Sequence, residues 1–189
     1  RQATPRPGSA PLALACTNNP YPEAEAEEKI YYSSFAEAPR TLDPAVAYNT
    51  TAHAVTGNVY DTLLEYHYLK RPYELIPGLA RRVPERRELP EGRVAYRFEL
   101  RPDLLFHADP CFELSGGEGA RTREVRAADV AFQLHRIADP AVNSPVLTKF
   151  SNIAGFREFS KALAARRKED PGFAERPARE QYAALGPIE

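Results

Sequence analysis

The sequence has no methionine and no tryptophan, contains only two cysteines, and carries a net charge of −1 over 189 residues. Because residue 1 is not methionine, we expect the chain to be processed or incomplete at its front. The 25 basic and 26 acidic residues are interspersed, so no basic stripe faces a phosphate backbone and nucleic acid is not an expected partner. No run approaches the roughly 18 apolar residues of a membrane-spanning helix, which predicts a soluble body.

The overall composition is that of an ordinary globular protein. Hydrophobic residues make up 43% and charged residues 27% of the chain, which excludes wholesale disorder and allows a buried core. Cys16 and Cys111 could pair, but their spacing does not show it, and neither lies in a CxxC or Cys/His zinc pattern. We expect one substantial domain, since no linker-like stretch divides the chain.

The first residues have the features of a processing site. Residues 11–15 (PLALA) place small apolar side chains directly before Cys16 and a polar stretch. This order is similar to the end of a lipoprotein signal, in which Cys16 would become the lipid attachment site. Residues 13–15 also fit an ordinary secretory cleavage site, and a free cysteine in a disordered leader is the third alternative. The first two predict export to the periplasm or cell surface, with residues 1–27 as signal remnant and tether and residues 28–189 as the folded part.

Extended segments are predicted in the first half of the chain. Residues 29–33 (KIYYS) are rich in strand formers and predict a first strand, followed by a loop that two prolines keep extended. Residues 51–66 carry apolar side chains at helical spacing and predict a helix. Residues 94–100 alternate and predict a hairpin with residues 79–88, turned by residues 90–92.

Helices dominate the predictions for the second half. Residues 127–138 predict an amphipathic helix that ends before Pro140. Residues 156–167 predict another, with Phe156, Phe159 and Leu163 facing inward, and residues 178–185 a short third. The glycine-rich residues 115–119 predict a loop. Interspersed strands and helices indicate the α/β class, in a mixed α+β form, and exclude a helical bundle or a pure β-sandwich.

Five segments occur in an order that resembles one family. They are residues 42–44 (LDP), 58–66 (NVYDTLLEY), 74–80 (ELIPGLA), 96–107 (YRFELRPDLLFH) and 125–140 (VRAADVAFQLHRIADP). Together they resemble the extracytoplasmic solute-binding protein family 5, which includes the oligopeptide- and dipeptide-binding proteins of ABC importers. The resemblance covers roughly residues 30–140.

The resemblance implies a periplasmic-binding-protein-like type II clamshell, in which a solute lies between two lobes. This chain would supply one incomplete, truncated lobe behind a disordered leader. The resemblance also implies capture of peptides or related solutes for ABC permease subunits in the membrane, with no cofactor and no enzymatic activity. One departure is Arg126, which stands where relatives commonly carry a helix-capping Thr or Ser; Asp129 can still favour the first turn.

The ligand-contacting regions that the resemblance implies are two short segments. The loop after the first strand would lie along a peptide-like ligand, with Glu37 facing an amine and Arg40 a carboxylate. The segment after the helix at 127–138 would approach the pocket. The alternatives are solvated charges in the loop and helix packing in the second segment. The residues concerned are Phe35, Ala36, Glu37, Ala38 and Arg40 in the loop, and Ser144, Val146 and Phe150 in the second segment.

Two other kinds of function stay open. The first is a membrane-anchored interaction or signalling domain without solute capture. The second is a metal-dependent enzyme that would use His107, Asp109 and Cys111, which stand within five residues of one another. An exposed turn explains those three residues better, because Pro110 limits the curling that a metal site needs, so no metal site is predicted.

Overall fold

The structure is a computed structural model that describes residues 25, 28–30, 32–113 and 121–188. The chain divides into two units, residues 1–36 and residues 37–189. In the first unit, the backbone N–H of Ile30 donates to the carbonyl of Glu28 at 2.9 Å, and the Tyr32 hydroxyl bonds to the Glu25 carboxylate. The sequence predicts a strand at residues 29–33. Four of these residues are described, and they adopt no regular structure, so the prediction is wrong for them. Strand-forming side chains stabilise a strand only when another strand pairs with it.

The first helix of the second unit is α1 (Thr50–Thr56). The Asn49 side chain accepts a hydrogen bond from the Ala52 N–H at 2.8 Å, so Asn49 caps the helix. At the other end the Asn58 amide donates to the Ala54 carbonyl at 2.6 Å. The prediction of a helix extending to residue 66 is wrong, because Gly57 and Asn58 are poor helix formers and the residues beyond them pair as a strand.

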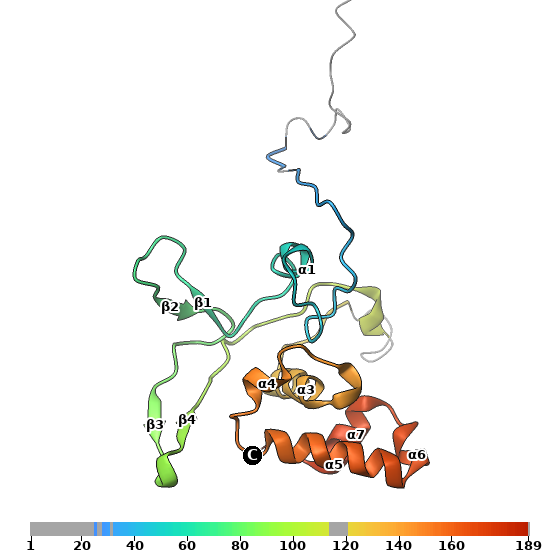
Figure 1. Cartoon of the computed structure of the whole chain (residues 1–189). Helices are drawn as coiled ribbons and strands as arrows, with labels where there is room; N and C mark the ends of the chain where they lie inside the picture. Colours follow the sequence, from blue (N-terminus) through green and yellow to red (C-terminus); the bar gives the residue numbers. More distant parts are fainter. Residues whose placement is uncertain (1–24, 26–27, 31, 114–120, 189) are drawn as a thin grey trace, which may run out of the picture. The chain divides into compact units, whose positions relative to one another are not determined.

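Two antiparallel hairpins follow α1, each with three-residue strands (Figure 1). Strand β1 (Leu64–Tyr66) pairs with β2 (Leu75–Pro77), a hairpin that the sequence analysis missed. Strand β3 (Arg86–Glu88) pairs with β4 (Val94–Tyr96) across the 3-10 turn η2 (Pro90–Gly92). The predicted hairpin is therefore confirmed, although its regular part is shorter than expected.

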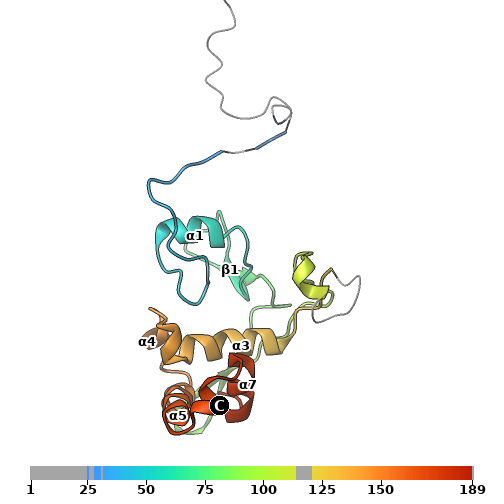
Figure 2. The same cartoon turned by 90° about the vertical axis from the view of Figure 1, so that its right-hand side faces the viewer.

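The second half is helical. Helix α3 (Ala127–Ala138) has the predicted bounds, α5 (Phe156–Glu169) is two residues longer than predicted, and α7 (Ala178–Leu185) is as predicted. Short helices join them: η4 (Pro140–Val142), α4 (Leu147–Phe150) and α6 (Pro171–Ala174). The turn η3 (Pro110–Phe112) precedes α3. Both views place α3 beside α5 and α7 (Figures 1 and 2).

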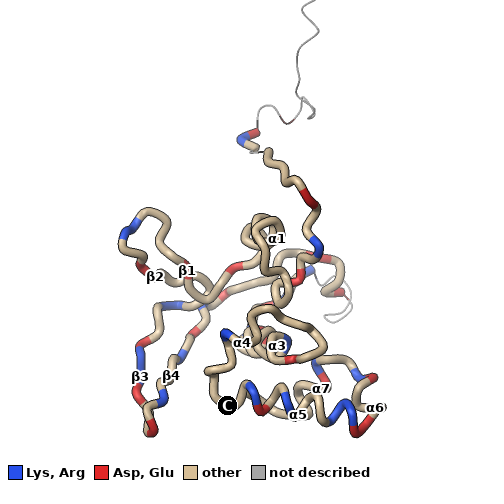
Figure 3. The backbone as a smooth tube through the Cα atoms, viewed as in Figure 1, with Lys and Arg blue, Asp and Glu red and all other residues tan. Residues whose placement is uncertain are grey.

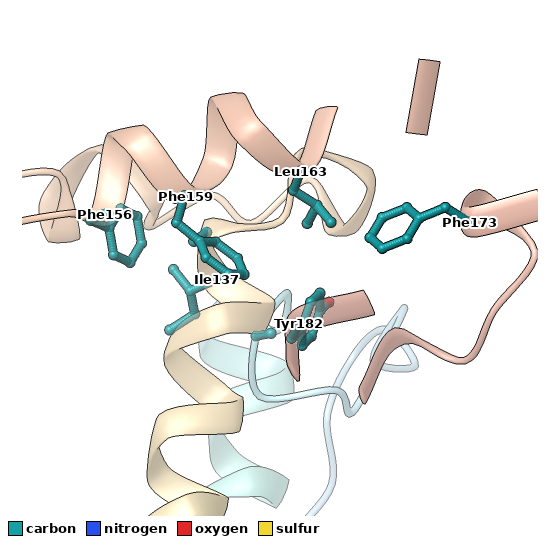
Figure 4. Packing of buried hydrophobic residues seen from close by; sticks show 8 residues of the cluster. Ile137, Phe156, Phe159, Leu163, Phe173 and Tyr182 are labelled. Carbon is teal, nitrogen blue, oxygen red and sulfur yellow. The ribbon is translucent and has the colours of Figure 1, made fainter. Parts of the chain in front are cut away.

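The core lies among these helices. Phe156, Phe159 and Leu163 are buried, as predicted, and pack with Ile137 of α3 and Tyr182 of α7 (Figure 4). Ala45, from the loop before α1, belongs to the same cluster. We call the buried residues Ile137, Phe156, Phe159, Leu163, Phe173 and Tyr182 the helical core.

The structure is thus mixed helix and strand with small sheets, which is compatible with the α/β class. Within the described part of the chain, no helix is long and apolar enough to cross a bilayer.

Candidate functional site

The turn at residues 42–44 is bonded to α3 across 93 positions of sequence. The Asp43 carboxylate accepts the Ala45 N–H at 3.0 Å, as expected for a turn aspartate. Both of its oxygens also accept hydrogen bonds from the Arg136 guanidinium, one at 2.8 Å. The hydrogen bond from Arg136 is the main cause that lowers the pKa of Asp43. This bidentate ion pair holds the end of the proposed ligand loop against α3.

Ser144 provides a second attachment. Its hydroxyl is buried and donates to the Ala45 carbonyl at 2.7 Å. Val146 and Phe150 are half-buried and pack against the helical core, and the Phe150 ring stacks on Phe156 with centroids 6.2 Å apart. All three residues therefore have a packing role, and their contact with a ligand stays a prediction.

The loop that would contact a ligand is exposed. Phe35 and Ala36 end the first unit, while Glu37, Ala38 and Arg40 begin the second, and all five side chains are exposed. Glu37 and Arg40 form no ion pair within the described residues. Both charges are thus accessible to a ligand, and their binding roles stay predictions.

The second and third resembling segments pair directly. The N–H groups of Gly78 and Ala80 donate to the Leu63 carbonyl at 3.1 and 3.0 Å, and the Leu79 N–H donates to the Thr62 carbonyl at 2.8 Å. A Cβ at Gly78 would lie 2.3 Å from the Thr62 carbonyl oxygen. Only glycine lets the two segments approach this closely.

The third segment in turn pairs with the fourth. The Arg81 N–H donates to the Glu99 carbonyl at 2.7 Å, and the Arg101 N–H donates to the Leu79 carbonyl at 3.0 Å. Ala80 and Leu100 form the bridge between these bonds, and Ala80 is fully buried.

The fourth segment pairs with the start of the fifth. The Val125 N–H donates to the Leu104 carbonyl at 2.8 Å, and the Phe106 N–H donates to the carbonyl of Arg123, just before the fifth segment, at 3.0 Å. Arg123 donates to both carboxylate oxygens of Asp129, at 2.9 and 2.6 Å, and this hydrogen bonding is the main cause that lowers the pKa of Asp129. The Asp129 carboxylate also accepts the Arg126 N–H at 2.9 Å. Asp129 thus supplies the N3 half of a capping box, but it does not replace the hydroxyl missing at Arg126, which would accept an N–H of the first turn.

A surface hollow of about 430 Å³ opens beside the first two segments. It is lined by Pro44 from the turn and by Tyr60, Asp61 and Glu65 from the second segment, among others. Tyr60, one of the lining residues, is 50% exposed. Sequence analysis missed this hollow, because it depends on how the segment beyond α1 folds back.

Two of the three alternative metal ligands, Asp109 and Cys111, interact with each other. Asp109 accepts the Cys111 N–H at 2.8 Å and caps η3, and this bond is the main cause that lowers the pKa of Asp109. The hydrogen bond with Asp109 raises the pKa of the Cys111 thiol, which disfavours the thiolate that would bind a metal. The described residues contain no group of three or more His, Cys, Asp or Glu side chains placed to hold a metal ion.

Asp139 joins helices α5 and α7 to the end of α3 through hydrogen bonds. It is 2% exposed and accepts two hydrogen bonds from Arg167, at 2.6 and 2.8 Å, and one from the Tyr182 hydroxyl at 2.7 Å. Burial alone would raise the pKa of Asp139, but these hydrogen bonds and one from the Ala141 N–H together lower it. Sequence analysis identified Asp139 only as a helix stop.

No family model and no curated protein matches the chain. Cys16 and the glycine-rich residues 115–119 lie outside the described residues.

Proposed function

We propose that the chain is part of an extracytoplasmic solute-binding protein that captures peptides or related solutes for an ABC importer. In this proposal it forms one lobe of a type II clamshell and is exported, with Cys16 as a lipid attachment site. One observation carries the proposal. The five segments that resemble the family are all joined by contacts. The first segment is bonded to the fifth through Asp43 and Arg136. The second pairs with the third, the third with the fourth, and the fourth with the start of the fifth.

This series supports the proposal because a clamshell lobe has to present its ligand loop from a rigid base. The loop at residues 37–40 leads directly into Asp43, which is bonded to α3. Its far end is therefore fixed, while its side chains stay exposed. Backbone held in this way can pair with an extended peptide, since main-chain groups supply affinity without dependence on the peptide's sequence.

Charges around the loop suit both ends of a peptide. Arg40 offers a guanidinium to a carboxylate, and Glu37 offers a carboxylate to an amine. Asp61 and Glu65, at the hollow, add two carboxylates that form no ion pair within the described residues. A zwitterionic solute such as a short peptide is the ligand class that this mixture favours.

The alternatives receive less support. A metal-dependent enzyme would need Asp109 and Cys111 as ligands, but the first caps η3 and the second has a raised pKa. A membrane-anchored interaction or signalling domain would need no solute, and it is distinguished from the leading proposal by the ligand test below.

The test uses the protein encoded by the whole reading frame that contains this chain. Its melting temperature is measured with pools of short peptides, with amino acids and with zinc. A ligand at one hundred times its Kd should stabilise the protein by about 2.7 kcal/mol and raise Tm by a few degrees.

Two variants sharpen this test. Arg40→Gln and Glu37→Gln should reduce the peptide-induced shift, while Glu91→Gln, at the distant η2 turn, is the matched control. If no peptide pool raises Tm, solute capture is wrong. If zinc alone does so and His107→Ala abolishes the shift, the metal-dependent alternative replaces it.

A further inference from the structure

The loop of the β1–β2 hairpin exposes an unusual set of apolar side chains. Tyr68 is 88% exposed, Leu69 76% and Tyr73 69%. Tyr66 and Leu75, on the two strands, are also exposed. We call residues 66–75 the aromatic tip. Single exposed apolar residues are normal on a protein surface, but a contiguous group marks an interaction site.

The aromatic tip has a defined conformation. The Tyr66 and Tyr73 rings meet edge to face with centroids 5.6 Å apart. The His67 N–H donates to the Glu74 carbonyl at 2.8 Å, and its ring Nδ1 accepts the N–H groups of Leu69 and Lys70 at 3.2 and 3.3 Å. These bonds define the backbone of the turn, from which the side chains of Tyr68 and Leu69 are exposed.

The same tip carries positive charge, and Figure 3 shows basic residues at the turn of this hairpin. Residues 68–73 include Lys70 and Arg71 and no acidic residue. Lys70 is paired with Glu74 at 2.8 Å, so the uncompensated charge comes from Arg71. The Arg71 guanidinium lies over the Tyr73 ring, 4.5 Å from its centroid.

We propose that the aromatic tip docks into the headgroup region of an anionic phospholipid bilayer. Tyrosine rings with a polar end, an outward leucine and an adjacent arginine are the side chains that partition into this region. Arg71 complements anionic headgroups. A handful of side chains on a protruding turn also falls short of the about 20 residues a side that a stable protein interface uses.

This inference is independent of the proposed function. Solute capture depends on the loop at residues 37–40, whereas the aromatic tip belongs to another element. Either proposal can fail while the other stands.

The absence of tryptophan from the sequence allows a direct test on the full chain, produced without acylation at Cys16. Leu69→Trp places a single fluorescent reporter on the aromatic tip. Tyr96→Trp places one on β4, where Tyr96 is 53% exposed, and is the matched control. Emission is recorded with vesicles of phosphatidylcholine alone and of phosphatidylcholine mixed with phosphatidylglycerol, at low and high salt.

We expect the Leu69→Trp emission to shift to shorter wavelength with anionic vesicles, and the shift to weaken at high salt. The Tyr96→Trp emission should not shift. In vesicle co-sedimentation, the double variant Tyr68→Ser, Leu69→Ser should lower the partition coefficient about tenfold, and Arg71→Gln about fivefold for anionic vesicles only.

Three results would overturn the inference. The first is an unchanged Leu69→Trp emission with every vesicle, and the second is an equal shift for Tyr96→Trp. The third is a dimer in sedimentation velocity without lipid that Tyr68→Ser dissociates, because the tip would then contact a second copy of the chain. Circular dichroism of each variant establishes that it is folded.

Discussion

Asp139 combines deep burial with hydrogen bonds from three different parts of the chain. Arg167 donates to both of its oxygens from α5, Tyr182 donates from α7, and the Ala141 N–H donates from η4. Arg167 also donates through Nε to Gln181 at 2.6 Å. Such a network stabilises the fold only while every member is present, because a buried charge left alone is costly.

Replacing Arg167 should therefore be strongly destabilising. We expect Arg167→Met to lower the free energy of unfolding by about 3 kcal/mol, measured by urea denaturation, since it leaves the Asp139 carboxylate buried without its counterion. Arg166→Met removes an exposed pair with Asp170 and should cost about 0.5 kcal/mol or less. Equal effects of the two variants would contradict this reading of the network.

His135 is the second residue with a distinctive environment. Its Nε2 is buried and has no hydrogen-bond partner among the residues that the structure describes. Its ring lies 4.6 Å from Phe159 and 5.7 Å from Tyr182, centroid to centroid. Burial lowers the pKa of His135 below its ordinary value of 6.5. The folded state thus favours the neutral imidazole.

This lowered pKa predicts a pH dependence of stability. Between pH 6.5 and the lower pKa of the folded state, the unfolded chain binds the proton more strongly, so stability should fall as pH decreases below 6.5. His135→Gln should remove this slope in urea denaturation at a series of pH values. His53→Gln, on the exposed side of α1, is the control. If the pH dependence of stability persists in His135→Gln, other titratable groups cause it.

At the scale of elements, the hairpins depend on two glycines for different reasons. Gly78 approaches the Thr62 carbonyl so closely that a Cβ would lie 2.3 Å from its oxygen. Gly92 has a positive φ of 71°, but apart from its own chain neighbours no atom of the described residues lies within 4 Å of the place where a Cβ would be. The first position is restricted by contact and the second by backbone conformation.

Alanine at the two positions should separate these causes. Gly78→Ala should destabilise the chain by more than about 2 kcal/mol, because the backbone of two segments has to move apart. Gly92→Ala should cost only about 1 kcal/mol, the usual cost of a left-handed conformation for alanine. Thermal unfolding of both variants gives the comparison, and an equal or reversed order would contradict it.

At the scale of the whole molecule, burial is unevenly distributed. The helical core lies entirely in α3, α5, α6 and α7, whereas β1–β4 contain no buried residue among those described. Local stability follows the number of buried apolar contacts, so the two hairpins should open more readily than the helices.

Hydrogen exchange read out by mass spectrometry should display this difference. We expect the slowest exchange in peptides from α3 and α5, and exchange faster by about a hundredfold or more in the β1–β2 loop. The Asp43 turn should be slower than the loop before it, because Arg136 and Ser144 hold it to the helices. Hairpins that exchange as slowly as α5 would contradict the uneven distribution.

The sequence by itself determined the parts whose pattern is local. Apolar spacing predicted α3, α5 and α7 and the buried Phe156, Phe159 and Leu163 of α5. The turn residues 90–92 predicted the β3–β4 hairpin, because helical periodicity and turn chemistry act over a few positions. The exposure of Glu37 and Arg40 and, as the alternative to ligand contact, the packing of the segment with Ser144 were also put forward from sequence, whereas the hydrogen bond from Ser144 to Ala45 was not.

Only the tertiary structure decided the rest. The apolar spacing from Thr51 to Tyr66 fits a helix, yet α1 ends at Thr56 because Leu64–Tyr66 finds β2 as a partner. The ion pairs of Asp43 with Arg136 and of Asp139 with Arg167 join residues 93 and 28 positions apart. Such contacts depend on how distant segments meet in space, and a local pattern carries no information about that meeting.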